Sequence, residues 1–119
     1  MENNTNQSNI LEGTIEFWIK EKKVDYSNNQ AIPLFQINPL GGSILIVKDS
    51  DNKIKLFHVF LGKGRTDIEC DVSKLDKSVK HMFAFTWSVK NKELKLYIDG
   101  KLKKSATIKY GSCPEFNLL

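Results

Sequence analysis

Hydrophobic and polar residues alternate along much of this chain, most clearly between residues 81 and 101. From His81 to Val89 every second side chain is aromatic, large and apolar, or histidine, and a mixed face lies between them. A polar turn follows at residues 90–92, and residues 94–98 then resume the alternation. Asp99-Gly100 is a pair that tolerates the positive φ angles of tight hairpin turns. The stretch therefore predicts two antiparallel strands bounded by turns.

Similar alternation recurs elsewhere, between breaks rich in Gly, Pro, Asn and Asp, and no segment shows helical periodicity. Residues 53–61 carry apolar side chains on both faces, which predicts either a central strand or a strand whose outer face a loop covers. The pattern predicts an all-β fold, an antiparallel two-sheet sandwich of about eight strands. The expected strands are residues 14–20, 32–38, 43–49, 53–61, 65–72, 81–89, 94–98 and 102–110.

The length of 119 residues fits one domain. Residues 1–9 are polar and rich in asparagine, so we expect a flexible N-terminal tail, followed by a single β-sandwich domain over 10–119. The start of the chain has no apolar signal-peptide core, and no stretch approaches the length of a membrane span. We therefore expect either a cytoplasmic protein or a domain excised from a longer secreted chain, without membrane partners.

The net charge of +4 comes from a lysine-rich composition in which Arg65 is the sole arginine. Nucleic-acid recognition favours clustered arginines with aromatic residues between them. The charge therefore indicates a soluble lysine-covered surface, and no nucleic-acid partner is expected.

Two stretches resemble concanavalin A-like, laminin-G-like jelly-roll domains, the family that includes lectins and glucanases. Residues 13–20, GTIEFWIK, are similar to an early strand of that family, and HMFAFTW with LKLYIDGK, residues 81–87 and 94–101, is similar to its later hairpin. The resemblance covers about residues 13–110. It implies a two-sheet sandwich that binds sugars, binds proteins or attaches to other domains, and it gives the hairpin a structural role.

Family members usually continue beyond this hairpin with one more strand, which lies next to the first one. This sequence ends at residues 115–119, where that strand would begin, so one strand is expected to be missing. Three explanations stay open: a truncated chain, pairing supplied by a neighbouring subunit, or an open edge. Because an open edge favours association, we expect a homo-oligomer formed through sheet edges.

The expected ligand-binding residues are Trp18 and Tyr97, with Glu16 and Lys95 beside them. Each aromatic residue lies on the polar face of its strand, where a sugar ring can stack while the neighbours supply hydrogen bonds. The alternative places Trp18 beneath a loop or at a subunit contact. The sequence thus favours a non-enzymatic, lectin-like binding or adhesion module with a glycan partner. The competing interpretation is a structural or protein-interaction domain that assembles through sheet edges and has no small-molecule ligand.

No catalytic residues are expected. Asp67, Glu69 and Asp71 alternate along one strand face, as carboxylates do in some glycosidases of this broad fold, but a solvated face paired with lysines explains them better. His58 and His81 lie inside predicted strands and are interpreted as packing residues.

No metal or other cofactor is expected either. Asp49, Asp51 and Asn52 are typical of a turn, and Ca²⁺ would need six to eight converging oxygens. Cys70 and Cys113 are not spaced as zinc ligands, and the sequence leaves open whether they form a disulfide.

Overall fold

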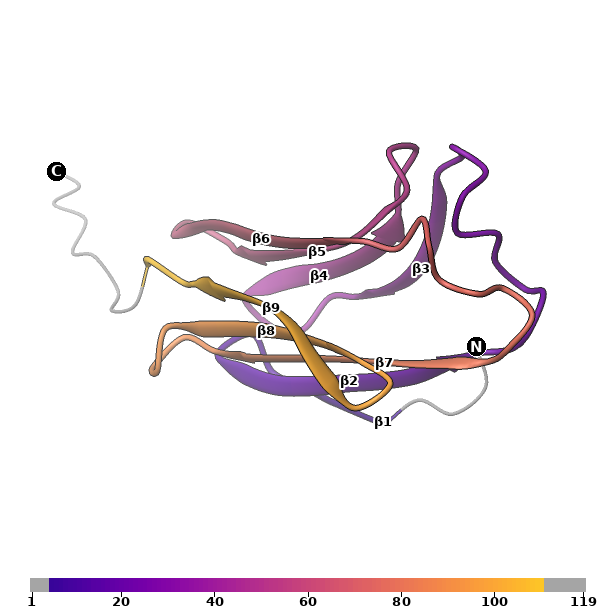
Figure 1. The fold of residues 1–119 in the computed structure, drawn as a ribbon. Coiled ribbons are helices and arrows are strands. Elements are labelled where there is room, and N and C mark those ends of the chain that lie inside the picture. The colour runs from indigo at the N-terminus through magenta and orange to yellow at the C-terminus, as the bar shows by residue number, and fades with distance from the viewer. Residues whose placement is uncertain (1–4, 111–119) are drawn as a thin grey trace, which may run out of the picture.

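The computed structural model describes residues 5–110 of the chain. The described part contains nine β-strands and no helix, and so no helix there is long and apolar enough to cross a membrane. The strands form two layers that pack face to face (Figure 1). They are β1 (Thr5–Ser8), β2 (Glu12–Ile19), β3 (Ile32–Ile37), β4 (Gly42–Lys48), β5 (Lys53–Phe60), β6 (Gly64–Asp71), β7 (His81–Ser88), β8 (Glu93–Ile98) and β9 (Lys101–Thr107).

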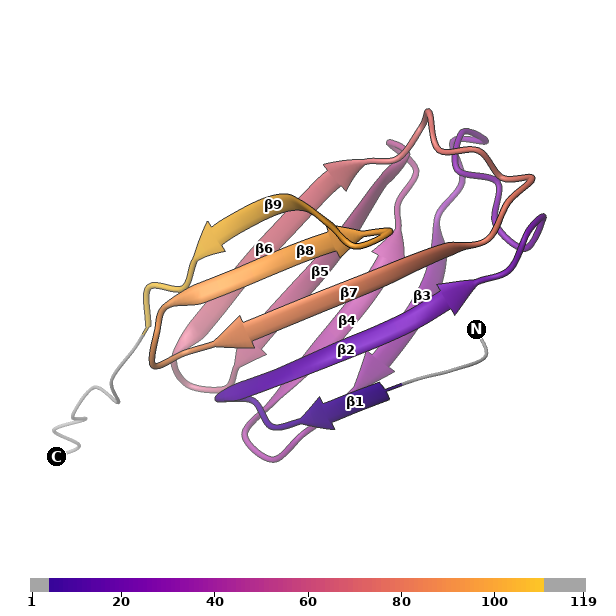
Figure 2. The same ribbon diagram turned by 60° about the horizontal axis from the view of Figure 1, so that its bottom comes forward.

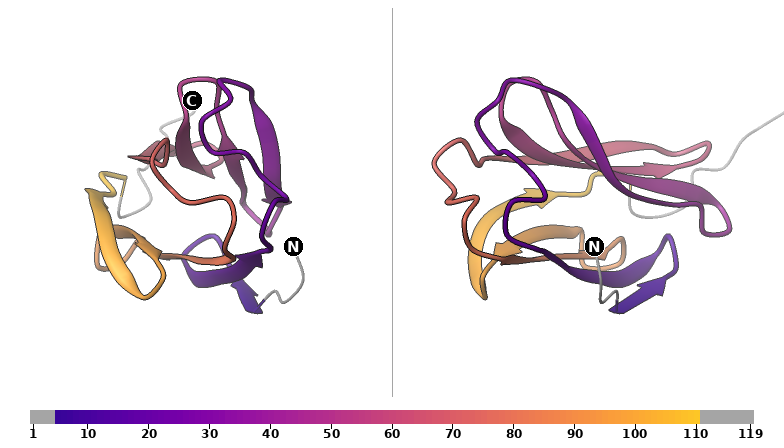
Figure 3. Two further views of the ribbon diagram at one scale, coloured as in Figure 1. Left: turned by 45° about the vertical axis from the view of Figure 1, so that its right-hand side comes forward. Right: turned by 90° about the vertical axis from the view of Figure 1, so that its right-hand side faces the viewer.

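The first layer is a five-stranded sheet in the order β1-β2-β7-β8-β9, and the second is a four-stranded sheet in the order β3-β4-β5-β6. Every neighbouring pair is antiparallel. Figure 2 views the molecule from the side of the five-stranded sheet, and Figure 3 shows both layers from their ends. The predicted all-β, two-sheet antiparallel sandwich is confirmed. The described residues hold one strand more than the eight expected, because β1 lies in the segment that was predicted to be a tail.

The prediction of a flexible tail over residues 1–9 is wrong for residues 5–8. These residues form β1, which pairs with β2 from Thr5 opposite Glu16 to Ser8 opposite Gly13. Because β2 also pairs with β7, the first long strand has sheet neighbours on both sides, and both come from the same chain. Backbone hydrogen bonds along a strand edge do not depend on apolar side chains, so a polar segment can occupy this position. The first four residues of the predicted tail lie outside the described part.

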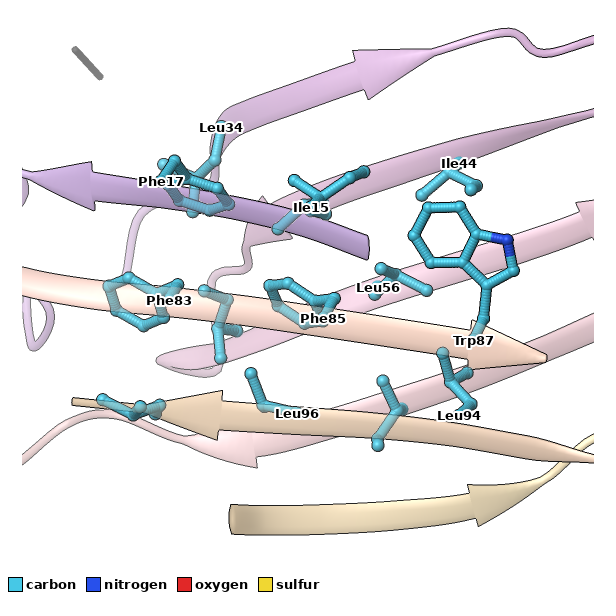
Figure 4. Close-up of a cluster of buried hydrophobic side chains, with 14 of the residues drawn as sticks. Ile15, Phe17, Leu34, Ile44, Leu56, Phe83, Phe85, Trp87, Leu94 and Leu96 are labelled. Atoms are coloured by element: carbon cyan, nitrogen blue, oxygen red, sulfur yellow. The ribbon is translucent and has the colours of Figure 1, made fainter. Parts of the chain in front are cut away.

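The core fills the space between the sheets with the inward side chains of β2, β7 and β8 from one layer and of β4 and β5 from the other (Figure 4). Phe17 lies at its centre, with its ring stacked 6.0 Å from Phe35, 5.7 Å from Phe83 and 6.4 Å from Phe85. Trp87 is also buried, as expected, and its indole N–H donates to the backbone oxygen of Asn9 at 2.7 Å. The alternation therefore identified the buried face of each of these strands.

The hairpin predicted between residues 81 and 101 is present as β7 and β8. Its register places Phe83 opposite Ile98 and Ser88 opposite Glu93. Asp99 and Gly100 both have positive φ, 52° and 82°, as a tight turn between β8 and β9 requires.

The last strand differs from its prediction over residues 102–110. β9 ends at Thr107, and a register shift in its pairing with β8 lies between Leu96 and Tyr97. A β-bulge of this kind changes which residues face the core. Leu102, the first apolar residue of the strand predicted over 102–110, is consequently 52% exposed.

β5 is a central strand with β4 and β6 on either side, so the first of the two alternatives for its two apolar faces is confirmed. The register aligns Leu45 with Phe57 and Ser43 with Val59 across β4 and β5. Leu45, Val47, Phe57 and Val59 are half-buried and do not belong to the core between the sheets. We call these four residues the outer apolar strip.

Candidate functional site

The outer face of the five-stranded sheet, which faces the viewer in Figure 2, is built from alternate residues of β2, β7 and β8. One row across these strands places Glu16 opposite Ala84, and Ala84 opposite Tyr97. Ala84 has a short side chain and is buried between these two larger residues. Glu16 is exposed and Tyr97 is half-buried.

The next row along this face aligns Thr14, Thr86 and Lys95. On the other side of the Glu16 row, Trp18 lies opposite Met82. The four residues predicted from the sequence, Trp18, Tyr97, Glu16 and Lys95, therefore share one face of one sheet. That they contact a ligand stays a prediction.

Trp18 is half-buried and has a cationic neighbour. The ammonium of Lys80, in the loop before β7, lies 4.9 Å from the centre of the indole ring. This geometry is a cation–π interaction, which holds the lysine over the ring. A ligand that stacks on Trp18 from this side has to displace Lys80, whereas Tyr97 has no cation–π partner within the described structure.

A polar hollow of about 220 Å³ lies on the same face, next to Lys95. We call it the Ser88 hollow, because Ser88 lies between Glu12 and Glu93 in one row across the three strands. The Ser88 hydroxyl accepts a hydrogen bond from the backbone N–H of Asn91 at 3.0 Å, which fixes its orientation. The hollow is lined by Glu12, Gly13, Thr14, Thr86, Trp87, Ser88 and Glu93.

The chemistry of the Ser88 hollow is that of hydroxyl and carboxylate oxygens with one ammonium nearby. The Lys95 ammonium lies 3.7 Å from a carboxylate oxygen of Glu93, and that carboxylate is 54% exposed. These groups accept and donate hydrogen bonds but do not form a metal site. No group of three or more His, Cys, Asp or Glu that could hold a metal ion occurs among residues 5–110.

Sequence reasoning missed this hollow although it placed the predicted residues on the same face. Thr86 and Ser88 belong to the strand that was interpreted as scaffold only. The available signal was the pair of hydroxyl residues on the outward positions of an otherwise apolar strand, at the end where a carboxylate, Glu93, follows the turn.

A larger hollow of about 380 Å³ lies at one end of the sandwich. Its lining is mostly apolar, and Leu40 beside it is 98% exposed. This surface offers few polar atoms for the hydroxyl groups of a sugar. It is lined by Asn9, Ile10, Leu11, Leu40, Gly41 and Phe60.

Two of the three alternating carboxylates of β6 are paired with cations, as expected. Asp67 lies 2.8 Å from the guanidinium of Arg65, and Glu69 lies 2.8 Å from the ammonium of Lys53. Both pairs are on the outer face of the four-stranded sheet, away from the Ser88 hollow. The face therefore matches the solvated, ion-paired interpretation.

The carboxylates at residues 49 and 51 also have a structural role. Both pair with the ammonium of Lys55, at 3.1 Å and 3.0 Å. The backbone N–H of Asn52 donates to the oxygen of Asp49, which closes the turn. Hydrogen bonds from the Ser50 backbone and from Lys55 lower the pKa of Asp49. The turn chemistry predicted for this cluster thus accounts for its oxygens.

Both histidines are buried within strands, as expected. His58 hydrogen-bonds through Nε2 to the backbone oxygen of Ile10 at 2.8 Å, and through Nδ1 to the hydroxyl of Tyr110 at 2.6 Å. Cys70 is half-buried, and this burial raises the pKa of its thiol. Its predicted alternative, a disulfide with Cys113, involves a residue outside the described part.

Comparison with known proteins gave no match among curated sequences. Two similar solved structures are the IT-sialidase CBM40 of Ruminococcus gnavus, bound to α2,3-sialyllactose, and the receptor binding domain of botulinum neurotoxin mosaic serotype C/D. The first has a TM-score of 0.61 and 17% identity over 85% of this chain. The second has a TM-score of 0.63 and 14% identity over 95% of this chain.

At these identities the two structures share the fold with this protein. The match covers 56% of the first structure's chain and 34% of the second, so this chain spans about half and about a third of their lengths. The family model of the concanavalin A-like lectin/glucanase superfamily matches residues 2–117, nearly the whole sequence. The chain therefore belongs to the concanavalin A-like lectin/glucanase superfamily, as its two characteristic stretches predicted.

Proposed function

We propose that this protein is a non-enzymatic carbohydrate-binding module and that the outer face of its five-stranded sheet is the binding surface. The observation that carries the proposal is the common location of Glu16, Trp18, Lys95 and Tyr97 on one face with the Ser88 hollow. Their positions supply an aromatic surface, charged hydrogen-bonding groups and a concave polar floor within a few strand spacings.

Each part of the face has a role in sugar recognition. The Tyr97 ring presents an apolar surface for the C–H face of a sugar. Sugar hydroxyls donate to the carboxylates of Glu16, Glu12 and Glu93, and they accept from the Lys95 ammonium. The hydroxyls of the hollow can do both.

The comparisons support the class of function without specifying the ligand. The Ruminococcus gnavus IT-sialidase CBM40 was solved with sialyllactose, and this chain shares its sandwich fold at 17% identity. That likeness makes a glycan a reasonable class of ligand for the fold. The site residues of this protein are argued from its own surface.

The absence of catalysis is part of the proposal. Glycosidases of the common type need one carboxylic acid held protonated and a second carboxylate across the bond. Glu12 and Glu93 lie two strand spacings apart, about 10 Å. Both are exposed, and the carboxylate of Glu93 pairs with the ammonium of Lys95 at 3.7 Å. The geometry thus supports binding better than hydrolysis.

A glycan array followed by calorimetric titration of the best sugar tests the function. Tyr97→Ala is expected to weaken binding at least tenfold, because it removes the stacking surface, and Thr86→Val to weaken it several-fold, because it removes one hydroxyl without changing shape. Phe57→Ala on the outer face of the other sheet is the matched control and should leave affinity unchanged. Sugar binding that survives both first substitutions would refute the site, and an array with no binding would refute the function.

The second candidate is a structural or protein-interaction domain. The outer apolar strip favours it, because contiguous apolar residues on an outer sheet face mark interaction surfaces. Assembly through sheet edges is the form predicted from the sequence, and the edge strands are β1 and β9 in one sheet and β3 and β6 in the other. Light scattering separates the candidates: a monomer at high concentration argues against assembly, and a concentration-dependent oligomer that Phe57→Ala weakens argues for it.

A further inference from the structure

We infer that the Ser88 hollow selects uncharged sugars and amino sugars and discriminates against acidic sugars such as uronic and sialic acids. This inference rests on the proposed function and adds the class of ligand. It follows from the charges of the residues that line the hollow, which differ in sign from the charge of the protein as a whole.

The lining contains two carboxylates and no cation. Glu12 and Glu93 flank Ser88 in one row, and Thr14 and Thr86 contribute hydroxyls between them. Glu16 adds a third exposed carboxylate on the same face of β2, next to Thr14. A sugar carboxylate placed among these groups would meet like charges, whereas a sugar ammonium would meet partners.

Two cations on this side of the sheet are already engaged. The Lys95 ammonium lies 3.7 Å from Glu93, and the Lys80 ammonium lies over the ring of Trp18 at 4.9 Å. An acidic sugar that recruited Lys95 would have to compete with Glu93 and would leave that carboxylate without its cation. The net charge of the side chains that line the hollow is therefore negative.

The net charge of +4 acts in the opposite direction, so distance decides which charge the ligand senses. At physiological ionic strength, interactions between exposed charges are screened beyond about 8 Å. Glu12 and Glu93 line the hollow itself, within contact distance of a ligand, whereas most of the lysines are spread over the rest of the surface. The local carboxylates thus determine selectivity, and the overall charge contributes mainly to the rate of encounter.

Matched sugar sets test this inference. The probes are glucose, glucosamine and glucuronic acid, with the galacto and manno counterparts, titrated by NMR against the full chain at 50 mM and 500 mM NaCl. In the series that binds, we expect the amino sugar to bind about tenfold or more tighter than the acidic sugar at low salt. Added salt should weaken the binding of the amino sugar and strengthen the binding of the acidic sugar, so the difference in affinity should become smaller.

The variant Glu12→Gln with Glu93→Gln should remove most of the difference between amino and acidic sugars. Both side chains are exposed, so the fold should be retained, and circular dichroism checks this. Glu69→Gln, which removes one carboxylate charge on the other sheet, is the control for a charge change away from the hollow. An acidic sugar that binds as tightly as its neutral counterpart would overturn the inference and leave the proposed function standing. If no sugar of any charge binds, both fail.

Discussion

The Nδ1 atom of His81 lies 2.7 Å from the Oδ2 atom of Asp99, and this contact joins the start of β7 to the turn after β8. The other ring nitrogen, Nε2, lies 2.7 Å from the backbone oxygen of Asp76. The second oxygen of Asp99 accepts from the backbone N–H of Met82 at 2.9 Å. His81 thus fastens a loop and a turn to one strand.

Asp99→Asn is expected to destabilise the protein by about 1 kcal/mol, because it removes a charged acceptor that is partly exposed to solvent. Burial raises the pKa of Asp99, but the hydrogen bonds from His81 and Met82 outweigh it and lower the pKa overall. A lowered carboxyl pKa stabilises the fold above the ordinary value of 3.8, and this contribution is lost as the pH falls through the lowered value. Urea unfolding between pH 2 and 5 should therefore show a shallower acid loss in the variant.

A double-mutant cycle with His81→Gln isolates the pair itself. The two substitutions should be less than additive, because each alone breaks the same interaction. Asp67→Asn, which changes an exposed ion pair with Arg65, is the control and should cost little. Strict additivity of the His81 and Asp99 substitutions would contradict the proposed coupling.

His58 is expected to make stability depend on pH in a different range. Burial is the main cause that lowers the pKa of its imidazole below the ordinary 6.5, against opposing hydrogen bonds to backbone oxygens. Below pH 6.5 the unfolded chain therefore binds a proton that the folded chain resists, and stability falls as the pH falls. The free energies of unfolding of wild type and His58→Gln should therefore approach each other as the pH falls from 7 to 5. His81 is present in both proteins, so it does not contribute to this difference. A constant difference over this range would refute the effect.

Lys48 is a buried cation held by neutral groups. It is 1% exposed, and its ammonium donates to the side-chain oxygens of Asn28 at 2.8 Å and Asn52 at 3.3 Å. Asn28→Ala should cost about 2 kcal/mol, because it leaves a buried charge with one acceptor fewer. In a Lys48→Met background the same change should cost much less, since no ammonium remains to be satisfied. Equal costs in the two backgrounds, measured by urea unfolding, would contradict this role.

Phe17→Ala is expected to destabilise the protein by about 3–5 kcal/mol, because it opens a cavity between three aromatic rings. Leu102→Ala is the contrasting change: its side chain is 52% exposed, so the free energy of unfolding should change by less than about 0.5 kcal/mol. Chemical denaturation measures both. A large decrease in the free energy of unfolding with Leu102→Ala would show that the register of β9 differs from the one described.

The sequence was sufficient to predict the inward faces of the long strands. Ile15, Phe17 and Phe85 are fully buried because side chains alternate across a strand whatever the strand pairs with. The same rule placed Glu16, Trp18 and Tyr97 outward. Periodicity could therefore assign each residue to a face before the neighbours of its strand were known.

Other features depend on which strands pair with each other, and the alternation of hydrophobic and polar residues could not predict them. β1 is polar and is held through the backbone of β2, so nothing in its side chains marked it as a strand. The Ser88 hollow needs Glu12 beside Ser88 and Ser88 beside Glu93, and the first of these contacts joins residues far apart in the chain. The exposure of Leu102 follows from the bulge next to it, which interrupts the alternation of β9.

The pairing of β2 with β7 also affects how the chain can fold. Its register runs from Glu12 opposite Ser88 to Ile19 opposite His81, whereas β3 to β6 pair only with their neighbours in sequence. On the ribosome the four-stranded sheet can therefore form by successive local hairpins, but β2 must wait until residue 88 has emerged. During that interval β2 lacks its neighbour β7 and Phe17 lacks the rings of Phe83 and Phe85, so this strand of the nascent chain needs protection from aggregation.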